Sequence, residues 1–388
     1  MRTPDDVIIA GAGPAGSTAA LMLARAGVRV RLLDRATFPR HKLCGDTLNP
    51  GAVAVLRRLR AADPIERLAI PLHGMVITGP GDVTVVGTYP AGVRGWSVLR
   101  RDLDSALLAQ AIDAGAVFEP STQVRGAVVD DRRIVGVRVR TAMGSTHELR
   151  APLTIAADGR RSTLAFGLRL ARHPARPRRW AIGAYFDAGA GDTALGEMHV
   201  RCGHYIGVAP VPGGLTNVCL VVCEPRAGTL SRPDALLRHV VQHDPMLRDR
   251  FHSAAMVTVP VSMGPLAVDT HRAGVPGLLL AGDAAGFIDP ITGDGLRFAL
   301  RGSELVAAIA LQALTGRVLD AAAALDRARR REFRRKWQLN RTVRSLVASS
   351  RGVRGASMLA RWHPAAVRRI VTAAGDVPRE PARSARHR

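Results

Sequence analysis

Four residues near the start of the chain have the types and the spacing to hold a dinucleotide. Gly11, Gly13 and Gly16 form a G-x-G-x-x-G turn, and Asp34 follows eighteen residues after the last glycine. In such a turn one glycine reverses the chain, one lets the backbone approach a pyrophosphate, and one lets a helix pack closely on a strand. An acid at this distance accepts hydrogen bonds from ribose hydroxyls. These residues predict dinucleotide binding, with FAD and NAD both possible from this stretch alone.

The segments around the turn predict the β-α-β unit that the motif requires. Residues 7–9 are a β-branched run, typical of a strand that is buried on both faces. A helix is expected over about residues 14–26, and a second strand over residues 28–33, ending at Asp34. The N-terminus of this helix would offer free N–H groups and the positive end of its dipole to the phosphates.

Cys44 is the candidate for proton transfer or nucleophilic chemistry. It lies in a C-G-D sequence shortly after Arg40, His41 and Lys42. A thiol near cations can have a lowered pKa and can act as an acid or a nucleophile. The alternative is a small side chain buried at a tight turn, and the local sequence leaves both interpretations open.

Two further buried strands end in the residue pairs that a cofactor clasp would need. The strands are expected over residues 153–157 and 277–281, and the pairs after them are Asp158, Gly159, Gly282 and Asp283. Ligands of open α/β sheets bind at such carboxyl ends. The turn-rich loop over residues 290–295 then opens a helix whose N–H groups could hold a flavin carbonyl. Two binding pieces so far apart would clasp one long cofactor, which favours FAD over NAD.

The order of these elements predicts an α/β (α+β) fold with three parts. A Rossmann-like FAD-binding domain is expected from residues 1–70, 95–175 and 265–330. An inserted antiparallel β-sheet substrate domain is expected from residues 71–94 and 176–264, with successive strands over residues 180–223 and one helix over residues 233–250. A basic helical C-terminal region, residues 331–388, would contain amphipathic helices over residues 340–348 and 358–371.

Charge is the most unusual feature of the composition. The net charge is +23, and from residue 321 onward eighteen Lys or Arg face four Asp or Glu. This basic region could be a helical lid on the FAD domain, or it could contact an anionic membrane. Aromatic residues are scarce among the basic runs, so nucleic acid is not expected as a partner. The sequence shows no long apolar run, no signal peptide and no metal-ligand spacing among its cysteines, which predicts a cytoplasmic protein, with peripheral membrane association as an option.

Three separated stretches, GAGPAG with Asp34, AADGRRS, and LAGDAAGFIDPITGDG, together resemble flavoprotein oxidoreductases of the aromatic-hydroxylase fold. Arg100 lies in R-R-D-L-D and matches the R-x-x-L-D of that family, where the arginine contacts FAD. The stretch FPRHKLCGDTLNPGAVAVL is similar to the cysteine loop of geranylgeranyl reductases, which faces the flavin. Motifs and resemblance together predict these cofactor-binding residues: Gly11, Gly13, Ala15, Gly16, Asp34, Arg35, Cys44, Gly45, Arg100, Val124, Asp158, Gly159, Gly282, Asp283, Pro290, Gly293 and Gly295.

The resemblance implies an FAD-dependent oxidoreductase that reduces a C=C bond of a lipophilic, polyprenyl-like substrate. Electrons would come from NAD(P)H or another donor, and Cys44 or a nearby water would supply the proton. The reductases carry Y-x-W-x-F-P where this chain keeps Tyr205 and Pro210 but has Gly207 and Ala209 in place of the aromatics. Tyr205, Gly207 and Pro210 are therefore the predicted substrate pocket, with a shape different from that of the reductases.

Two other activities are compatible with the same motifs. One is an FAD-dependent monooxygenase that hydroxylates an aromatic or polyketide-like substrate with molecular oxygen. The other is a non-catalytic prenyl-binding protein on the same fold. Flavin halogenases are also related, but their lysine-bearing W-x-W-x-I-P stretch is absent from this sequence.

Overall fold

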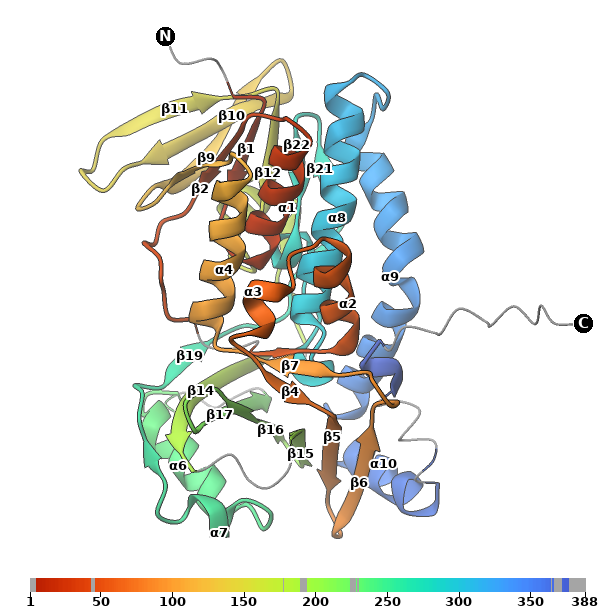
Figure 1. Ribbon diagram of the computed structural model, residues 1–388. Helices are drawn as coiled ribbons and strands as arrows, with labels where there is room; N and C mark the ends of the chain where they lie inside the picture. The colour runs from red at the N-terminus through yellow and green to blue at the C-terminus, as the bar shows by residue number, and fades with distance from the viewer. Residues whose placement is uncertain are drawn as a thin grey trace, which may run out of the picture.

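The computed structural model describes residues 5–42, 46–176, 178–188, 194–223, 228, 230–363, 365 and 372–376. Its first layer is a six-stranded sheet of order β21-β22-β12-β1-β2-β8 (Figure 1). The strands are β1 Val7–Ala10, β2 Val30–Leu33, β8 Val117–Glu119, β12 Leu153–Ala156, β21 Gly274–Val275 and β22 Leu278–Leu280. All neighbours are parallel except β21 and β22. The predicted Rossmann-like sheet is confirmed.

Successive side chains of a strand point to opposite faces of the sheet, and different elements pack on the two faces. Val7 and Ile9 of β1 lie in a core shared with helices α1 Pro14–Arg25, α4 Arg100–Asp113 and α8 Gly295–Leu314. Ile8 and Ala10 lie in a second core, shared with the meander β9 Gln123–Asp130, β10 Arg133–Arg140 and β11 Thr146–Arg150. The short elements α5 Thr163–Gly167, β13 Ala171–Arg172 and β20 Asp269–Thr270 lie on the same side as this meander.

The second layer is an eight-stranded sheet that is almost entirely antiparallel. Its path is β18-β14-β17-β16-β15-β5-β6, with β19 also paired to β14, and only β15 and β5 run parallel. The strands are β5 Gly74–Gly79, β6 Val83–Thr88, β14 Arg179–Asp187, β15 Leu195–Arg201, β16 His204–Val211, β17 Leu215–Cys223, β18 Ala255–Met256 and β19 Val261–Met263. A three-stranded sheet, β3 Thr47–Leu48, β7 Gly95–Ser97 and β4 Ile70–Leu72, lies between the two large sheets (Figure 1).

The single helix expected over residues 233–250 is wrong, because the structure has two helices. Helix α6 Pro233–His243 ends at Asp244, which is extended, and α7 Arg248–Phe251 follows. Asp244 precedes a proline, and a residue in that position disfavours the helical conformation. Its carboxylate instead binds the guanidinium of Arg201 at 2.7 and 2.9 Å. The two helices cover one face of the second sheet, over a core that includes Ile182 and Phe186.

In the described part of the C-terminal region, helices α9 and α10 have boundaries different from the predicted ones. Helix α9 runs without a break over Ala321–Leu346, so residues 340–346 continue it and do not form a separate helix. Helix α10 covers Ser350–Trp362, and the remainder of the helix expected over residues 358–371 lies largely outside the described residues. None of the helices in the described part of the chain is both long and apolar enough to cross a membrane.

Candidate cofactor and substrate site

A cavity of about 870 Å³ extends between the two large sheets. One end is lined by the Gly11–Gly13 turn and by Asp34, from the first sheet. The other end is lined by Ala181, Tyr185 and Leu215, from the second sheet. This volume is in the range of cofactor and drug-sized ligand sites.

Two of the three motif glycines lie where a Cβ would clash with the backbone. A Cβ on Gly11, whose φ is +100°, would lie 2.5 Å from the carbonyl oxygen of Ala157, so only glycine turns the chain there. A Cβ on Gly16 would lie 1.8 Å from the carbonyl oxygen of Gly11, so Gly16 permits close packing of helix and strand and does not line the cavity. The side of Gly13 is open except for Nη2 of Arg40 at 3.4 Å. No side chain of the described residues caps α1, which leaves its N-terminus available to a phosphate.

Asp34 is fixed at the end of β2 by two backbone donors. Its Oδ2 accepts from the N–H of Ala12 at 2.8 Å, and its Oδ1 accepts from the N–H of Ala36 at 2.9 Å. Each carboxylate oxygen keeps a second lone pair. Because Asp34, Arg35 and Val124 line the same end of the cavity, the remaining lone pairs can accept from ribose hydroxyls.

Two arginines share one buried counter-charge at the phosphate end. Arg100 donates from Nε and Nη2 to the two oxygens of Asp104, at 2.8 and 2.9 Å. Arg40 approaches the same carboxylate at 3.1 Å, and the Asp104 side chain has no exposed surface. Nε of Arg40 is buried without a hydrogen-bond partner within the described structure. Two cations against one carboxylate leave net positive charge where a pyrophosphate would lie.

Sequence reasoning identified Arg100 but did not assign Arg40 or Lys42 to the cofactor. Both line the cavity. Burial, together with the nearby charges of Arg100 and Arg40, lowers the pKa of Lys42 to about 8. The feature of the sequence that could have identified both residues is the cluster of cationic side chains between the end of the second strand and Cys44.

The second half of the clasp lies opposite the glycine turn. Asp158, Gly159, Gly282 and Asp283 all line the cavity. Oδ2 of Asp158 accepts from the N–H of Thr163 at 2.8 Å, while its Oδ1 is buried without a partner among the described residues. Burial raises the pKa of Asp283, and the charges of Lys42 and Arg160 oppose that shift. The orphaned acceptor of Asp158, the open Gly13 backbone and the excess cations fit an FAD molecule.

The loop that opens α8 completes this half. It contains the short 3₁₀ helices η1 Gly282–Ala285 and η2 Pro290–Thr292. Pro290 and Gly295 line the cavity, whereas Gly293 lies outside the lining and adopts φ +65° at the turn. Ala15 of α1 lines the cavity nearby.

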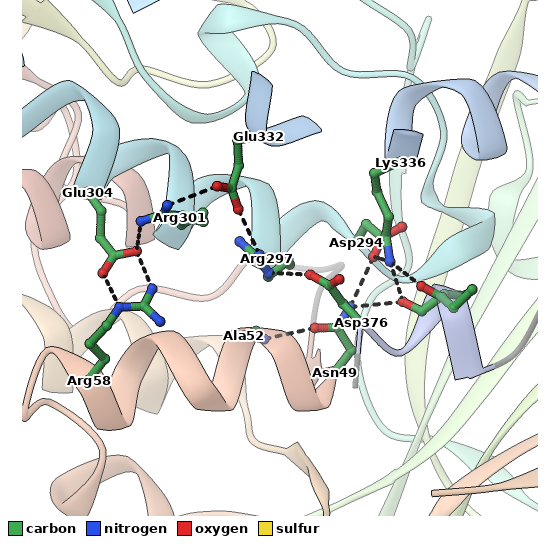
Figure 2. Close-up of polar contacts among 12 residues, drawn as sticks. Asn49, Ala52, Arg58, Asp294, Arg297, Arg301, Glu304, Glu332, Lys336 and Asp376 are labelled. Atoms are coloured by element: carbon green, nitrogen blue, oxygen red, sulfur yellow. Dashed lines mark hydrogen bonds and ion pairs between the residues drawn. The ribbon is translucent and has the colours of Figure 1, made fainter. Parts of the chain in front are cut away.

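A series of ion pairs and hydrogen bonds, which we call the charged ladder, connects this loop to Lys336 of α9 and to Asn49, as Figure 2 shows. The buried carboxylate of Asp294 accepts from Lys336 of α9 at 3.0 Å and from Asn49 at 3.0 Å. Lys336 also donates to the carbonyl oxygens of Ala373 and Ala374, at 2.8 and 2.7 Å. The C-terminal residues are therefore tied to the cofactor loop.

The same ladder continues along α8. Arg301 bridges Glu304 at 2.9 Å and Glu332 of α9 at 2.8 Å (Figure 2). Glu304 also accepts two hydrogen bonds, at 2.8 and 2.5 Å, from the guanidinium of Arg58, at the end of α2 Pro50–Arg58. Helix α3 Asp63–Glu66 follows α2 in the chain.

A buried network around Asp46 joins the cysteine loop to the second sheet. Oδ1 of Asp46 accepts from the N–H of Arg100 at 2.9 Å. Its Oδ2 accepts from the hydroxyl of Tyr185 at 2.9 Å and from the side-chain amide of Asn217. Burial raises the pKa values of Asp46 and Tyr185, and the Asp46 carboxylate adds to the shift of Tyr185. The Tyr185 hydroxyl therefore keeps its proton at the cavity wall.

Cys44 and Gly45 lie outside the described residues, so their roles stay predictions. The residues on either side of them are informative. Lys42 lines the cavity, and Asp46 belongs to the network that holds Tyr185 there.

Tyr205, Gly207 and Pro210 do not line this cavity. The hydroxyl of Tyr205 donates to Asp289 at 2.7 Å, and Asp289 also pairs with Arg179. The carbonyl oxygen of Pro210 accepts from Ser97. These contacts join the second sheet to the loop that contains Asp289 and to β7 Gly95–Ser97. Tyr205 and Pro210 therefore connect these parts of the fold and do not line the cavity.

The fold and the site define a flavin-dinucleotide-binding α/β protein. Residues 5–342 match the family described as FAD binding domain, and the chain belongs to that family. It is 31% identical over 322 residues to a menaquinone reductase of Mycolicibacterium smegmatis, covering 79% of this chain and 76% of that one. It is 29% identical over 330 residues to a digeranylgeranylglycerophospholipid reductase of Methanosarcina mazei, covering 81% and 77%. The protein is an FAD-dependent oxidoreductase.

Solved structures share the architecture. A flavin-dependent brominase triple mutant superposes with a TM-score of 0.82 at 19% identity, covering 97% of both chains. A geranylgeranyl bacteriochlorophyll reductase-like protein from Thermoplasma acidophilum superposes with a TM-score of 0.78 at 21% identity, covering 97% of this chain and 99% of that one. Identities this low support the fold alone.

Proposed function

We propose that this enzyme reduces C=C bonds of a lipophilic, polyprenyl-like substrate with electrons from NAD(P)H or another donor. The observation that carries the proposal is that one cavity is lined both by the charged residues of the cofactor end and by apolar side chains. The charged end holds Asp34, Arg40 and Lys42, whereas Leu215, Met263 and Phe287 line the other parts. Relatives named for polyprenyl-bearing substrates support the same substrate class.

The segment around β19 supplies an apolar edge to this cavity. Val259 and Val261 line it, yet their side chains are 86% and 46% exposed. Exposed aliphatic side chains at a cavity edge favour entry of an apolar chain, because burial of that chain removes both apolar surfaces from water.

The second sheet has a row of small residues on the face that carries Tyr185. Gly183, Cys219 and Gly207 are paired across β14, β17 and β16 and so lie in one row on this face. A Cβ on Gly207 would meet no atom of the described residues closer than 3.8 Å. Gly207 and Ala209 replace the Trp and Phe of the reductase motif, so this face of the sheet has a shape different from that of the reductases.

FAD, when bound, would supply the two-electron hydride chemistry. Arg40 and Arg100 would neutralise the pyrophosphate, and Asp34 would hold the ribose. Tyr185 presents a protonated hydroxyl at the cavity wall, and Asp46 and Asn217 fix its position. Reduction of an alkene needs one proton besides the hydride, and Cys44 remains the predicted donor.

The proposal is tested with the FAD-loaded enzyme under anaerobic conditions. Menaquinone and a geranylgeranyl glycerophospholipid are incubated with NADPH, or with dithionite where NADPH does not reduce the flavin. After any quinol has been reoxidised chemically to the quinone, mass spectrometry should detect a gain of two hydrogen atoms per reduced C=C bond of the prenyl chain. A product that gains one oxygen atom, and forms only when air is admitted, would overturn the proposal in favour of monooxygenation. A purified protein that cannot be loaded with FAD, and that binds these lipids without forming a product, would favour a prenyl-binding function.

A further inference from the structure

Helix α10 exposes its larger apolar side chains to solvent, unlike an ordinary surface helix. Met358, Leu359 and Trp362 are 64%, 53% and 77% exposed. Residues 358 and 362 are four apart and lie on one face, with residue 359 beside them. A surface helix normally turns such residues toward the core and polar residues toward water.

The inner face of α10 is built from small residues that fix the helix in place. Val353, Ser357 and Ala360 are buried, and Val353 belongs to a core shared with Val221 and Val347. A Cβ on Gly79 of β5 would lie 2.6 Å from the Ser357 hydroxyl, so helix and sheet are in close contact. Figure 1 shows α10 at the edge of the molecule beside β5 and β6. The outward direction of Met358 and Trp362 is therefore set by packing.

The charge of this helix is of one sign. It carries Arg351, Arg354 and Arg361 and no acidic residue, and all three arginines are exposed. None of them forms an ion pair within the described part of the chain. Arg351 lies on the same stripe as Met358 and Trp362, while Arg354 and Arg361 border one side of it.

We propose that the outer face of α10, formed by Arg351, Arg354, Met358, Leu359, Arg361 and Trp362, binds the surface of an anionic phospholipid bilayer. Apolar side chains flanked by arginines are what an interfacial helix needs, and tryptophan is favoured at the headgroup level. A second copy of this chain is a poor occupant, because each copy carries a net charge of +23. Nucleic acid would satisfy the arginines, but it would leave Met358 and Leu359 without an apolar partner.

The inference does not depend on the proposed reaction, because binding can be measured without substrate or turnover. The full-length FAD-loaded protein is sedimented with vesicles of phosphatidylcholine alone or of phosphatidylcholine mixed with phosphatidylglycerol. It should bind the anionic vesicles and not the neutral ones, and binding should weaken as salt is raised.

Two variants remove the two halves of the surface. The variant M358S/W362S should lower the partition coefficient at least ~10-fold, because both apolar anchors are lost. The variant R351Q/R354Q/R361Q should lower it ~100-fold at low salt, at about fivefold per arginine. The matched controls are M143S, at a methionine that is 96% exposed on the far meander, and R125Q/R132Q/R140Q, which removes the same charge from exposed positions there. Both controls should bind as the parent does.

A spectroscopic measurement keeps the test independent of variant stability. Brominated lipids should quench the tryptophan emission of the parent protein, and W362F should bind while losing most of that quenching. Equal binding to neutral and anionic vesicles would overturn the proposal, as would equal losses in the control variants. Self-association that M358S/W362S abolishes, with no vesicle binding by the parent, would assign the surface to a second copy instead.

Discussion

The substitution Asp104→Asn tests the reasoning about the phosphate end most directly. The Asp104 side chain is fully buried and faces Arg100 at 2.8 and 2.9 Å and Arg40 at 3.1 Å. An asparagine side chain would fill the same volume but would leave two guanidinium groups without their counter-charge. Removal of one partner from a buried ion pair costs about 3–5 kcal/mol. With about 2 cal/mol/K of unfolding entropy per residue, this predicts a melting temperature about 4–6 °C lower for the apoprotein.

The effect on the FAD-loaded protein should be smaller. A bound pyrophosphate supplies negative charge to the same two arginines, so it replaces part of what Asp104 provides. The assay is thermal unfolding of the apoprotein and the FAD-loaded protein, for the parent, for D104N and for a control variant. Asp102→Asn is the matched control, since Asp102 lies on the same helix and pairs only with the exposed Arg101 among the described residues. The reasoning is refuted if D104N unfolds like D102N, or if FAD leaves the loss from D104N unchanged.

Three further predictions concern the same cavity. Gly13→Val should abolish FAD retention, because its Cβ and methyl groups would enter the space between the turn and Arg40; a yellow protein with full FAD content would contradict this. Asp283→Ala should weaken FAD binding ~10- to 100-fold in a fluorescence titration, since a hydrogen bond to a charged acceptor is worth about 1.5–3 kcal/mol, and an unchanged Kd would remove Asp283 from the site. Lys42 has a pKa lowered to about 8, and bound FAD would raise it, so FAD affinity should fall as pH rises through 8 and beyond; the slope should be absent in Lys42→Met.

The β-α-β unit was predictable because its signals are local. The run from Val7 to Ile9, the three glycines and Asp34 each specify structure within a few residues of themselves. The signal that ends helix α6 before Pro245 is equally local. A proline disfavours the helical conformation of the residue before it, so Pro245 predicts two helices within residues 233–250. Element existence followed from periodicity, whereas the continuity of α9 through residue 340 was missed, although its charged face continues across residues 340–346.

The network around Asp46 could not be predicted from spacing. Its members come from the cysteine loop, β14, β17 and the start of α4, so only the packed fold brings Asp46, Tyr185 and Asn217 together. The same limit applies to Tyr205. Strand periodicity places Tyr205 and Gly207 on one face, but it does not say which part of that face adjoins the cavity and which part is covered by Asp289 and α10.

The two interpretations of the basic C-terminal region are compatible because different helices serve them. Helix α9 is packed against α8, where its Glu332 pairs with Arg301, and its Lys336 pairs with Asp294 of the loop before α8. This is the lid-like role, and it uses charges that point inward and are neutralised by Asp294 and Arg301. Helix α10 uses charges that point outward and are not neutralised within the described residues, beside apolar side chains that the core does not need. The net charge of the region therefore overstates what is available to a partner, and the separation of paired from unpaired arginines, not their number, identifies the surface to test.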